Sequence, residues 1–154
     1  MKIAIIGAGN MGGAVARGLA KGTLIATSDI YVANPSTPKL EALKSEFPEI
    51  NTTTDNRSAA AAADLIILAV KPWKVEHVIE ELKSHLDYTR QAVASMVGGL
   101  GMAQFEEWLS KGEQRRPTAY IIIPNTAIAT MSSMTFISSA RSTTLRRRSS
   151  HDLL

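Results

Sequence analysis

Residues 2–13 have the sequence KIAIIGAGNMGG, and they carry the clearest indication of the fold. It begins with the apolar run Lys2–Ile6, which is typical of a strand buried on both faces of a sheet. Glycines follow at the spacing G-x-G-x-x-G, and a helix is expected from Met11 to Lys21, where Gly22 stops it. A strand, a glycine loop and a helix in this order predict a turn whose backbone N–H groups and helix dipole face a bound phosphate.

Each glycine of this loop is expected to have its own role. Gly7 makes the tight turn, Gly9 lets a pyrophosphate approach the backbone, and Gly12 lets the helix pack closely on the strand. A glycine-rich turn without a ligand is the alternative. The position of the loop, directly after the first strand and at the start of the first helix, favours a dinucleotide site.

The rest of the chain alternates between apolar runs typical of buried strands and segments with the apolar spacing of helices. Further strands are expected at Asp29–Asn34, Asp64–Val70, Gln91–Val97 and Thr118–Ile123, with another candidate at Met134–Ser138. Further helices are expected at Pro38–Phe47, Ser58–Ala63, Val75–Leu86 and Met102–Leu109. This alternation predicts an α/β fold, a doubly wound and mostly parallel sheet of the Rossmann-like NAD(P)-binding type.

Composition narrows the possible classes of protein. The chain has 154 residues and 45% hydrophobic residues, which fits one domain with a packed core. It has no cysteine, which excludes disulfides, thiolate nucleophiles and cysteine-bound metals, and a reducing, cytoplasmic setting is expected. Its three histidines do not have the spacing of a metal site, so no metal is expected. No apolar run approaches the ~20 residues that span a bilayer, so no membrane partner is expected.

The net charge of +3 comes from the C-terminal tail. Residues 141–154 contain four arginines and one aspartate, and residues 1–140 are neutral. We therefore expect a dinucleotide-binding domain at 1–140 and a basic, poorly ordered tail at 141–154. A short helix or a contact with an acidic partner is the alternative for the tail. A neutral body with 5% aromatic residues predicts no nucleic-acid partner.

The end of the second expected strand bears on which cofactor is bound. An NAD site usually has Asp or Glu there, which bonds the adenosine ribose, whereas this chain has Asn34 followed by Pro35, Ser36 and Thr37, with Lys39 nearby. Amide and hydroxyl groups donate hydrogen bonds to a 2′-phosphate and a lysine adds charge, so NADP is favoured over NAD. The same residues also fit ordinary turn chemistry with Ser36 or Thr37 as the helix N-cap, and both interpretations can hold together.

Several motifs together resemble those of the pyrroline-5-carboxylate reductase family. They are Ile6–Met11 (IGAGNM), Asn34-Pro35, Asn56, Leu68–Pro72 (LAVKP), Ser95–Gly99 and Pro124-Asn125-Thr126. The glycine loop alone is shared with many dehydrogenases, and LAVKP with its flanking motifs is more specific. The resemblance covers about residues 1–140. It implies an oxidoreductase that reduces 1-pyrroline-5-carboxylate to L-proline with NAD(P)H in proline biosynthesis. Together with the residues after the second expected strand, it predicts an NADP-dependent enzyme, with NAD as a weaker cofactor.

The resemblance also implies roles for individual residues. The pyrophosphate loop would comprise Ile6, Gly7, Ala8, Gly9, Asn10 and Met11, with Gly12 next to them. Asn34 and Ser36 would lie near the adenosine ribose and its phosphate, and Asn56 would bind the adenosine half. The nicotinamide side would be lined by Ala69, Val70, Lys71 and Pro72. On the residues alone, Lys71 is equally a solvated residue at a strand end.

Two further positions are implied to lie near the nicotinamide, Asn125 and Thr126, although the residues alone are equally those of a turn. No histidine, aspartate or glutamate in residues 1–126 stands out as a proton donor, so no catalytic residue is assigned.

The chain departs from the family pattern after residue 140. Family members continue for about as long again, with a helical domain that forms a homo-oligomer and completes the substrate pocket. The sequence after 140 does not resemble the start of that domain, so we expect the cofactor-binding half of the enzyme, with poor turnover by itself. The alternatives are an isolated NADP-binding module, or another Rossmann oxidoreductase such as an F420-linked NADP reductase or a 3-hydroxyacid dehydrogenase.

Overall fold

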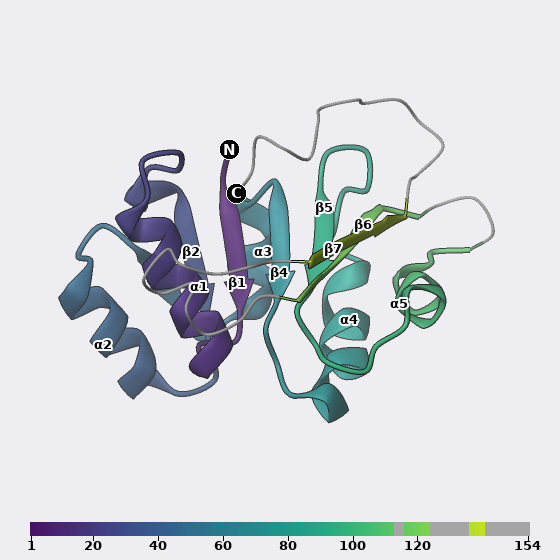
Figure 1. Cartoon of the computed structure of the whole chain (residues 1–154), viewed down its shortest axis with the longest axis horizontal. Helices are drawn as coiled ribbons and strands as arrows, with labels where there is room; N and C mark the ends of the chain where they lie inside the picture. Colours follow the sequence, from purple (N-terminus) through teal and green to yellow (C-terminus); the bar gives the residue numbers. More distant parts are fainter. Residues whose placement is uncertain (113–115, 124–135, 141–154) are drawn as a thin grey trace.

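The computed structural model describes residues 1–112, 116–123 and 136–140, which form one sheet with helices on both faces (Figure 1). Within this part of the chain the strand order is β3-β2-β1-β4-β5-β6-β7. Strands β1 to β6 are parallel to their neighbours, and β7 runs antiparallel to β6. The strands are β1 (Ile3–Ile6), β2 (Ile30–Ala33), β3 (Asn51–Thr53), β4 (Leu65–Leu68), β5 (Ala92–Ser95), β6 (Thr118–Ile123) and β7 (Phe136–Ala140). The predicted doubly wound, mostly parallel sheet is confirmed.

The side chains of β1 show why helices cover both faces. Successive strand residues point to opposite faces, and all four residues of β1 are apolar and buried. Ile3 and Ile5 belong to the core under α1 and α2, whereas Ala4 and Ile6 belong to the core under α3, α4 and α5. The helices are α1 (Asn10–Lys21), α2 (Thr37–Glu46), α3 (Asn56–Ala62), α4 (Val75–Lys83) and α5 (Met102–Leu109).

The amphipathic pattern after β4 forms a shorter helix than predicted. A short 3₁₀ turn, Pro72–Lys74, precedes α4, which buries Val78, Ile79 and Leu82 and ends at Lys83. Leu86 is also buried, although it lies beyond the helix end. Its side chain continues the apolar pattern because the loop after α4 packs onto the same core.

One strand was not predicted from the sequence. The three residues of β3 are polar and half-buried, so they carry no apolar signal, and β3 lies at the edge of the sheet. Its structure comes from pairing with β2, with Thr52 opposite Val32. The strand matters for function because it brings the chain back to the same sheet edge as the ends of β1 and β2.

The starts of α3 and β7 also differ from the prediction. Helix α3 begins at Asn56, two residues before the expected Ser58, because the Asp55 side chain caps it by accepting a hydrogen bond from the Arg57 N–H at 3.0 Å. Strand β7 starts two residues after the expected Met134. The Pro124-Asn125-Thr126 motif and the tail at 141–154 lie outside the described residues.

Candidate functional site

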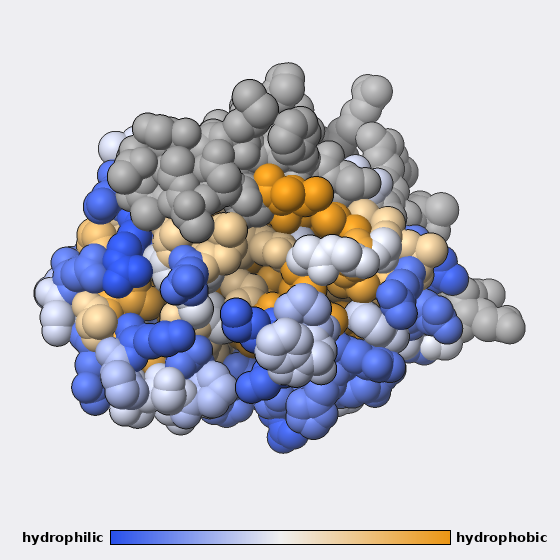
Figure 2. Space-filling view, turned by 60° about the horizontal axis from the view of Figure 1, so that its bottom comes forward, coloured by the Kyte–Doolittle hydropathy of each residue, from blue (hydrophilic) through white to orange (hydrophobic). Residues whose placement is uncertain are grey.

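The carboxyl ends of the strands gather the predicted site residues at one edge of the sheet. Strand β1 lies between β2 and β4. The chain leaves β1 and β2 through helices on one face, and reaches and leaves β4 through helices on the other. The connections therefore diverge between β1 and β4, which is where open α/β sheets bind ligands. Figure 2 turns this edge forward and shows apolar side chains in the middle of the face, with hydrophilic side chains at its sides and below.

The glycine loop shows why two of its glycines are needed for packing. Gly7 has φ +104°, a conformation that other residues rarely adopt, and a Cβ there would lie 2.6 Å from the carbonyl oxygen of Ala69. At Gly12 a Cβ would lie 1.9 Å from the carbonyl oxygen of Gly7. The backbones of β1, α1 and the end of β4 therefore approach one another so closely that a side chain at either glycine would not fit.

Gly9 has a different environment. A Cβ at this position would have no atom within 4 Å, so the backbone of the loop is open on this side. Gly9 is the N-cap of α1, and the first hydrogen bond of the helix runs from the Gly13 N–H to the Gly9 carbonyl at 2.8 Å. The N–H groups of Asn10, Met11 and Gly12 precede that bond and point out of the helix start. An open backbone with helix-start N–H groups is what a pyrophosphate requires.

Asn34 ties the glycine loop to the loop after β2. Its side chain is buried, and its Oδ1 accepts a hydrogen bond from the Ala8 N–H at 3.0 Å. Its Nδ2 donates to the carbonyl oxygen of Ser36 at 2.9 Å and to the Ser36 hydroxyl at 3.0 Å. The amide is therefore engaged within the protein, which differs from the expectation of a free donor. A direct contact from Asn34 to a nucleotide stays a prediction.

The same hydrogen bonds orient Ser36. Its Oγ accepts from Asn34, so its own hydroxyl proton points elsewhere. Ser36 is the N-cap of α2, and its side chain makes no capping bond to the helix. The exposed Ser36 hydroxyl, with Thr37 beside it, thus lies at the positive end of α2.

Lys39 lies in the first turn of α2 and lines a hollow of about 320 Å³ between α1 and α2, with Gly9 and Asn10 on the other wall. Arg17 also lines this hollow and forms a bidentate ion pair with Glu46 at 2.7–3.0 Å. Hydrogen bonding to Arg17 lowers the pKa of the Glu46 carboxyl. The pair joins α1 to α2 and so fixes the width of the hollow.

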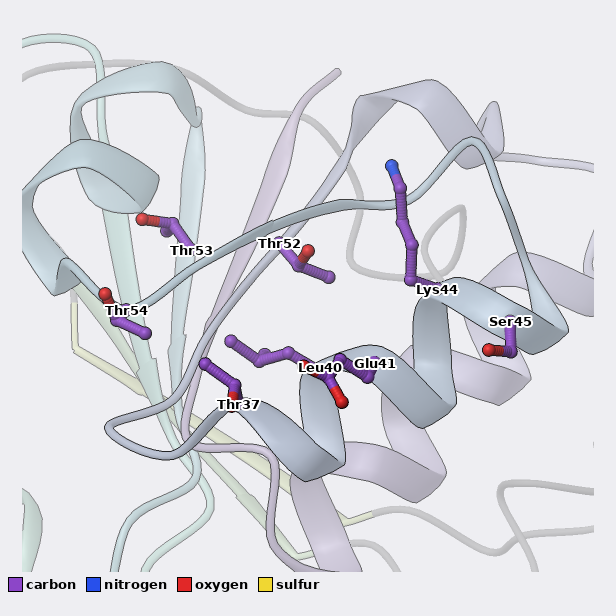
Figure 3. A pocket seen from close by; sticks show the side chains of 8 residues that line it. All are labelled: Thr37, Leu40, Glu41, Lys44, Ser45, Thr52, Thr53 and Thr54. Carbon is purple, nitrogen blue, oxygen red and sulfur yellow. The ribbon is translucent and has the colours of Figure 1, made fainter.

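A larger hollow of about 600 Å³ lies between α2 and β3 (Figure 3). Thr37 and Leu40 of α2 line one side, and Thr52, Thr53 and Thr54 line the other. These threonines were not among the predicted site residues, and the run TTT after Asn51 was the available signal in the sequence. Their hydroxyls add polar groups beside the end of β2.

The end of β4 supplies the residues predicted for the nicotinamide side. The Ala69 N–H donates to the Ile6 carbonyl at 2.8 Å, and Ala69 packs against the glycine loop. Val70 is half-buried, whereas Lys71 and Pro72 are exposed at the sheet edge. The next residue, Trp73, is 76% exposed. Asn56, at the start of α3, donates from Nδ2 to Glu81 at 3.2 Å.

The predicted residues that the structure describes therefore lie at one edge of the sheet, most of them in three adjoining groups at the ends of β1, β2 and β4. Asn56 follows β3, at the start of α3. Among residues 1–112, 116–123 and 136–140, no cluster of three potential metal ligands is found. The helices of this described part are all too short or too polar to cross a membrane.

Comparison with known proteins places this arrangement in a family. The family model described as "NADP oxidoreductase coenzyme F420-dependent" matches residues 2–99. The chain belongs to this family. The match spans the sheet from β1 to the end of β5, including the glycine loop, the Asn34 turn and the end of β4.

Relatives with known names confirm the resemblance found in the sequence. A pyrroline-5-carboxylate reductase of Vibrio alginolyticus is 36% identical over 109 residues, which cover 71% of this chain and 39% of the relative. The enzyme of that name from Escherichia coli strain K12 is 33% identical over 88% of this chain and 48% of its own length. The chain thus spans two-fifths to half of the length of these relatives.

Solved structures of pyrroline-5-carboxylate reductases have the same fold as this chain. A pyrroline-5-carboxylate reductase from Coxiella burnetii has a TM-score of 0.81 and 33% identity, over 93% of this chain and 51% of that protein. A Plasmodium falciparum pyrroline carboxylate reductase with NADP bound has a TM-score of 0.78 and 23% identity, over 99% of this chain and 51% of that protein. At that identity the second match supports the fold alone.

Proposed function

We propose that this chain is the NADP-binding part of a pyrroline-5-carboxylate reductase. The observation that carries the proposal is the Gly7–Gly12 loop, which is open at Gly9 and is linked through Asn34 to the start of α2. Relatives of the chain are named pyrroline-5-carboxylate reductases. The pyrophosphate would lie on the N–H groups at the start of α1. The nicotinamide would lie at the end of β4, beside Ala69–Pro72.

NADP is proposed over NAD because the end of β2 offers donors and positive charge to a 2′-phosphate. The hydroxyl proton of Ser36 is directed away from Asn34, and Lys39 lies in the first turn of α2, on the wall of the hollow beside the glycine loop. No carboxylate occupies the place of Asn34, where one would repel the phosphate.

The proposed reaction is transfer of a hydride from NADPH to the imine carbon of 1-pyrroline-5-carboxylate, with a proton added to the imine nitrogen, to give L-proline. The cofactor supplies the hydride, and the chain's own task is to bind and orient it. The described residues cover one side of the nicotinamide position, where Lys71, Pro72 and Trp73 are exposed. The other wall of the pocket would come from the part of the protein that the relatives have in addition, in a cytoplasmic homo-oligomer.

A second candidate is reduction or oxidation of coenzyme F420 with NADP, which the description of the matching family favours. The two candidates share the NADP site and differ in the second substrate. Assays with 1-pyrroline-5-carboxylate and with reduced F420 therefore separate them.

The test has two readings on the purified chain of 154 residues. Energy transfer from its two tryptophans to NADPH is expected to reveal saturable binding, with NADPH bound more tightly than NADH. Turnover with 1-pyrroline-5-carboxylate is expected near background, because the described residues form only one side of the proposed nicotinamide position. Absence of any dinucleotide binding would contradict the proposal. Rapid proline formation would show that the chain completes the substrate site by itself.

A further inference from the structure

The Asn56 side chain is hydrogen-bonded to an acidic residue of the next helix. Asn56 is the first residue of α3, and its Nδ2 donates to Oε2 of Glu81 in α4 at 3.2 Å. The second oxygen of Glu81 lies 3.9 Å from Nε of Arg57. Both Asn56 and the Glu81 side chain are partly buried, the latter with 25% exposure. The contact joins residues that are 25 positions apart.

The chemistry of this contact fixes which way the Asn56 amide faces. An ionised carboxylate accepts hydrogen bonds and donates none, so Glu81 attracts the NH₂ end of the amide and repels the carbonyl end. Glu81 therefore holds Nδ2 toward α4 and leaves Oδ1 on the other side of the side chain. Asn56 then presents a hydrogen-bond acceptor, whereas a free asparagine can turn over and present either group.

The strand order indicates which part of the dinucleotide reaches Asn56. The glycine loop follows β1, the Asn34–Ser36 turn follows the neighbouring strand β2, and the start of α3 follows the edge strand β3. A dinucleotide with its pyrophosphate at the end of β1 and its ribose at the end of β2 brings its base next to β3. The adenine amino group is a hydrogen-bond donor, and it matches an acceptor at Asn56.

We propose that Glu81 is a positioning residue that makes Asn56 an acceptor for the adenine amino group. This inference rests on the proposed NADP site. It assigns to Glu81 the discrimination of adenine from a base that has an acceptor at the same position.

The experiment compares NADPH with its hypoxanthine analogue, in which a carbonyl oxygen replaces the amino group. The wild-type chain is expected to prefer NADPH about tenfold, because one hydrogen bond is lost and two acceptors are brought together. Glu81→Gln is expected to bring this ratio close to one, because a glutamine can donate or accept and so lets the Asn56 amide turn over.

The matched control is Glu80→Gln, which removes the same charge one residue earlier. Glu80 is exposed and pairs with Lys83 at 2.6 Å on the helix surface, so this variant should keep the wild-type ratio. Circular dichroism and thermal unfolding check that all variants are folded. The ratio of the two affinities is the decisive readout, since a general loosening of α3 would weaken both nucleotides together.

A second variant tests whether Glu81 acts through Asn56. Asn56→Ala should also abolish the preference, and adding Glu81→Gln to it should change the ratio no further. The inference is overturned if the wild-type chain binds both nucleotides equally, or if Glu81→Gln keeps the preference. Failure of the wild-type chain to bind NADPH at all would overturn the proposed function, and this inference with it.

Discussion

Gly9→Val is expected to abolish nucleotide binding while leaving the fold intact. Gly9 has φ −70° and ψ −167°, an extended conformation that valine adopts readily, and its missing Cβ faces open space. The free energy of unfolding should therefore change by less than about 1 kcal/mol, as for most surface substitutions. The valine side chain would instead fill the space through which a pyrophosphate approaches the loop.

The loss of affinity follows from the hydrogen bonds that the phosphate would no longer make. A hydrogen bond to a charged group contributes about 1.5–3 kcal/mol, so losing two costs roughly 3–6 kcal/mol. At about 1.4 kcal/mol for each factor of ten, NADPH should bind at least about 100-fold more weakly. Titration by energy transfer to NADPH and urea unfolding measure the two quantities on the same samples.

Gly12→Ala is the matched control, because its main effect should be on the stability of the fold. Its Cβ would lie 1.9 Å from the Gly7 carbonyl oxygen, so the backbone must shift, and such overpacking typically costs about 1–3 kcal/mol or more. A folded Gly9→Val variant that binds NADPH within about threefold of the wild type would refute the placement of the pyrophosphate at this loop. A Gly12→Ala variant as stable as the wild type would refute the packing argument.

Two further substitutions test the turn after β2 and the start of the sheet. Asn34→Asp should weaken the binding of NADPH about tenfold or more relative to that of NADH, because it places a carboxylate near the 2′-phosphate and removes the donor that orients Ser36. An unchanged ratio of the two affinities in paired titrations would contradict this. The hydrogen bond from the Lys2 N–H, with Arg90 assisting, lowers the pKa of Asp64, so its stabilising effect is present above the ordinary carboxyl pKa and is lost as the pH falls through the lowered value. Asp64→Asn should therefore reduce the free energy of unfolding at pH 7 by up to about 1 kcal/mol, since the ion pair with Arg90 is partly solvated. This difference between the variant and the wild type should shrink below about pH 4. A constant difference in unfolding curves from pH 7 to pH 3 would refute the prediction.

The sequence could predict the features that depend on local pattern. The apolar run Lys2–Ile6, the glycine spacing after it and the LAVKP segment each lie within a few residues, and their residue types restrict the backbone directly. The strands β1, β2, β4, β5 and β6 and their order of alternation with helices were predicted for this reason. Strand β3 was not, because its three polar residues acquire their structure only by pairing with β2.

The tertiary structure alone decided how the candidate site residues are used. Asn34 is read from the sequence as a missing acid, but its contact with Ala8 joins residues 26 positions apart, and it shows the amide linking two loops. The contact between Asn56 and Glu81 likewise joins two helices. Which end of an amide faces a ligand depends on the group that hydrogen-bonds its other end in the folded protein. That group is distant in the sequence, so the local sequence pattern does not identify it.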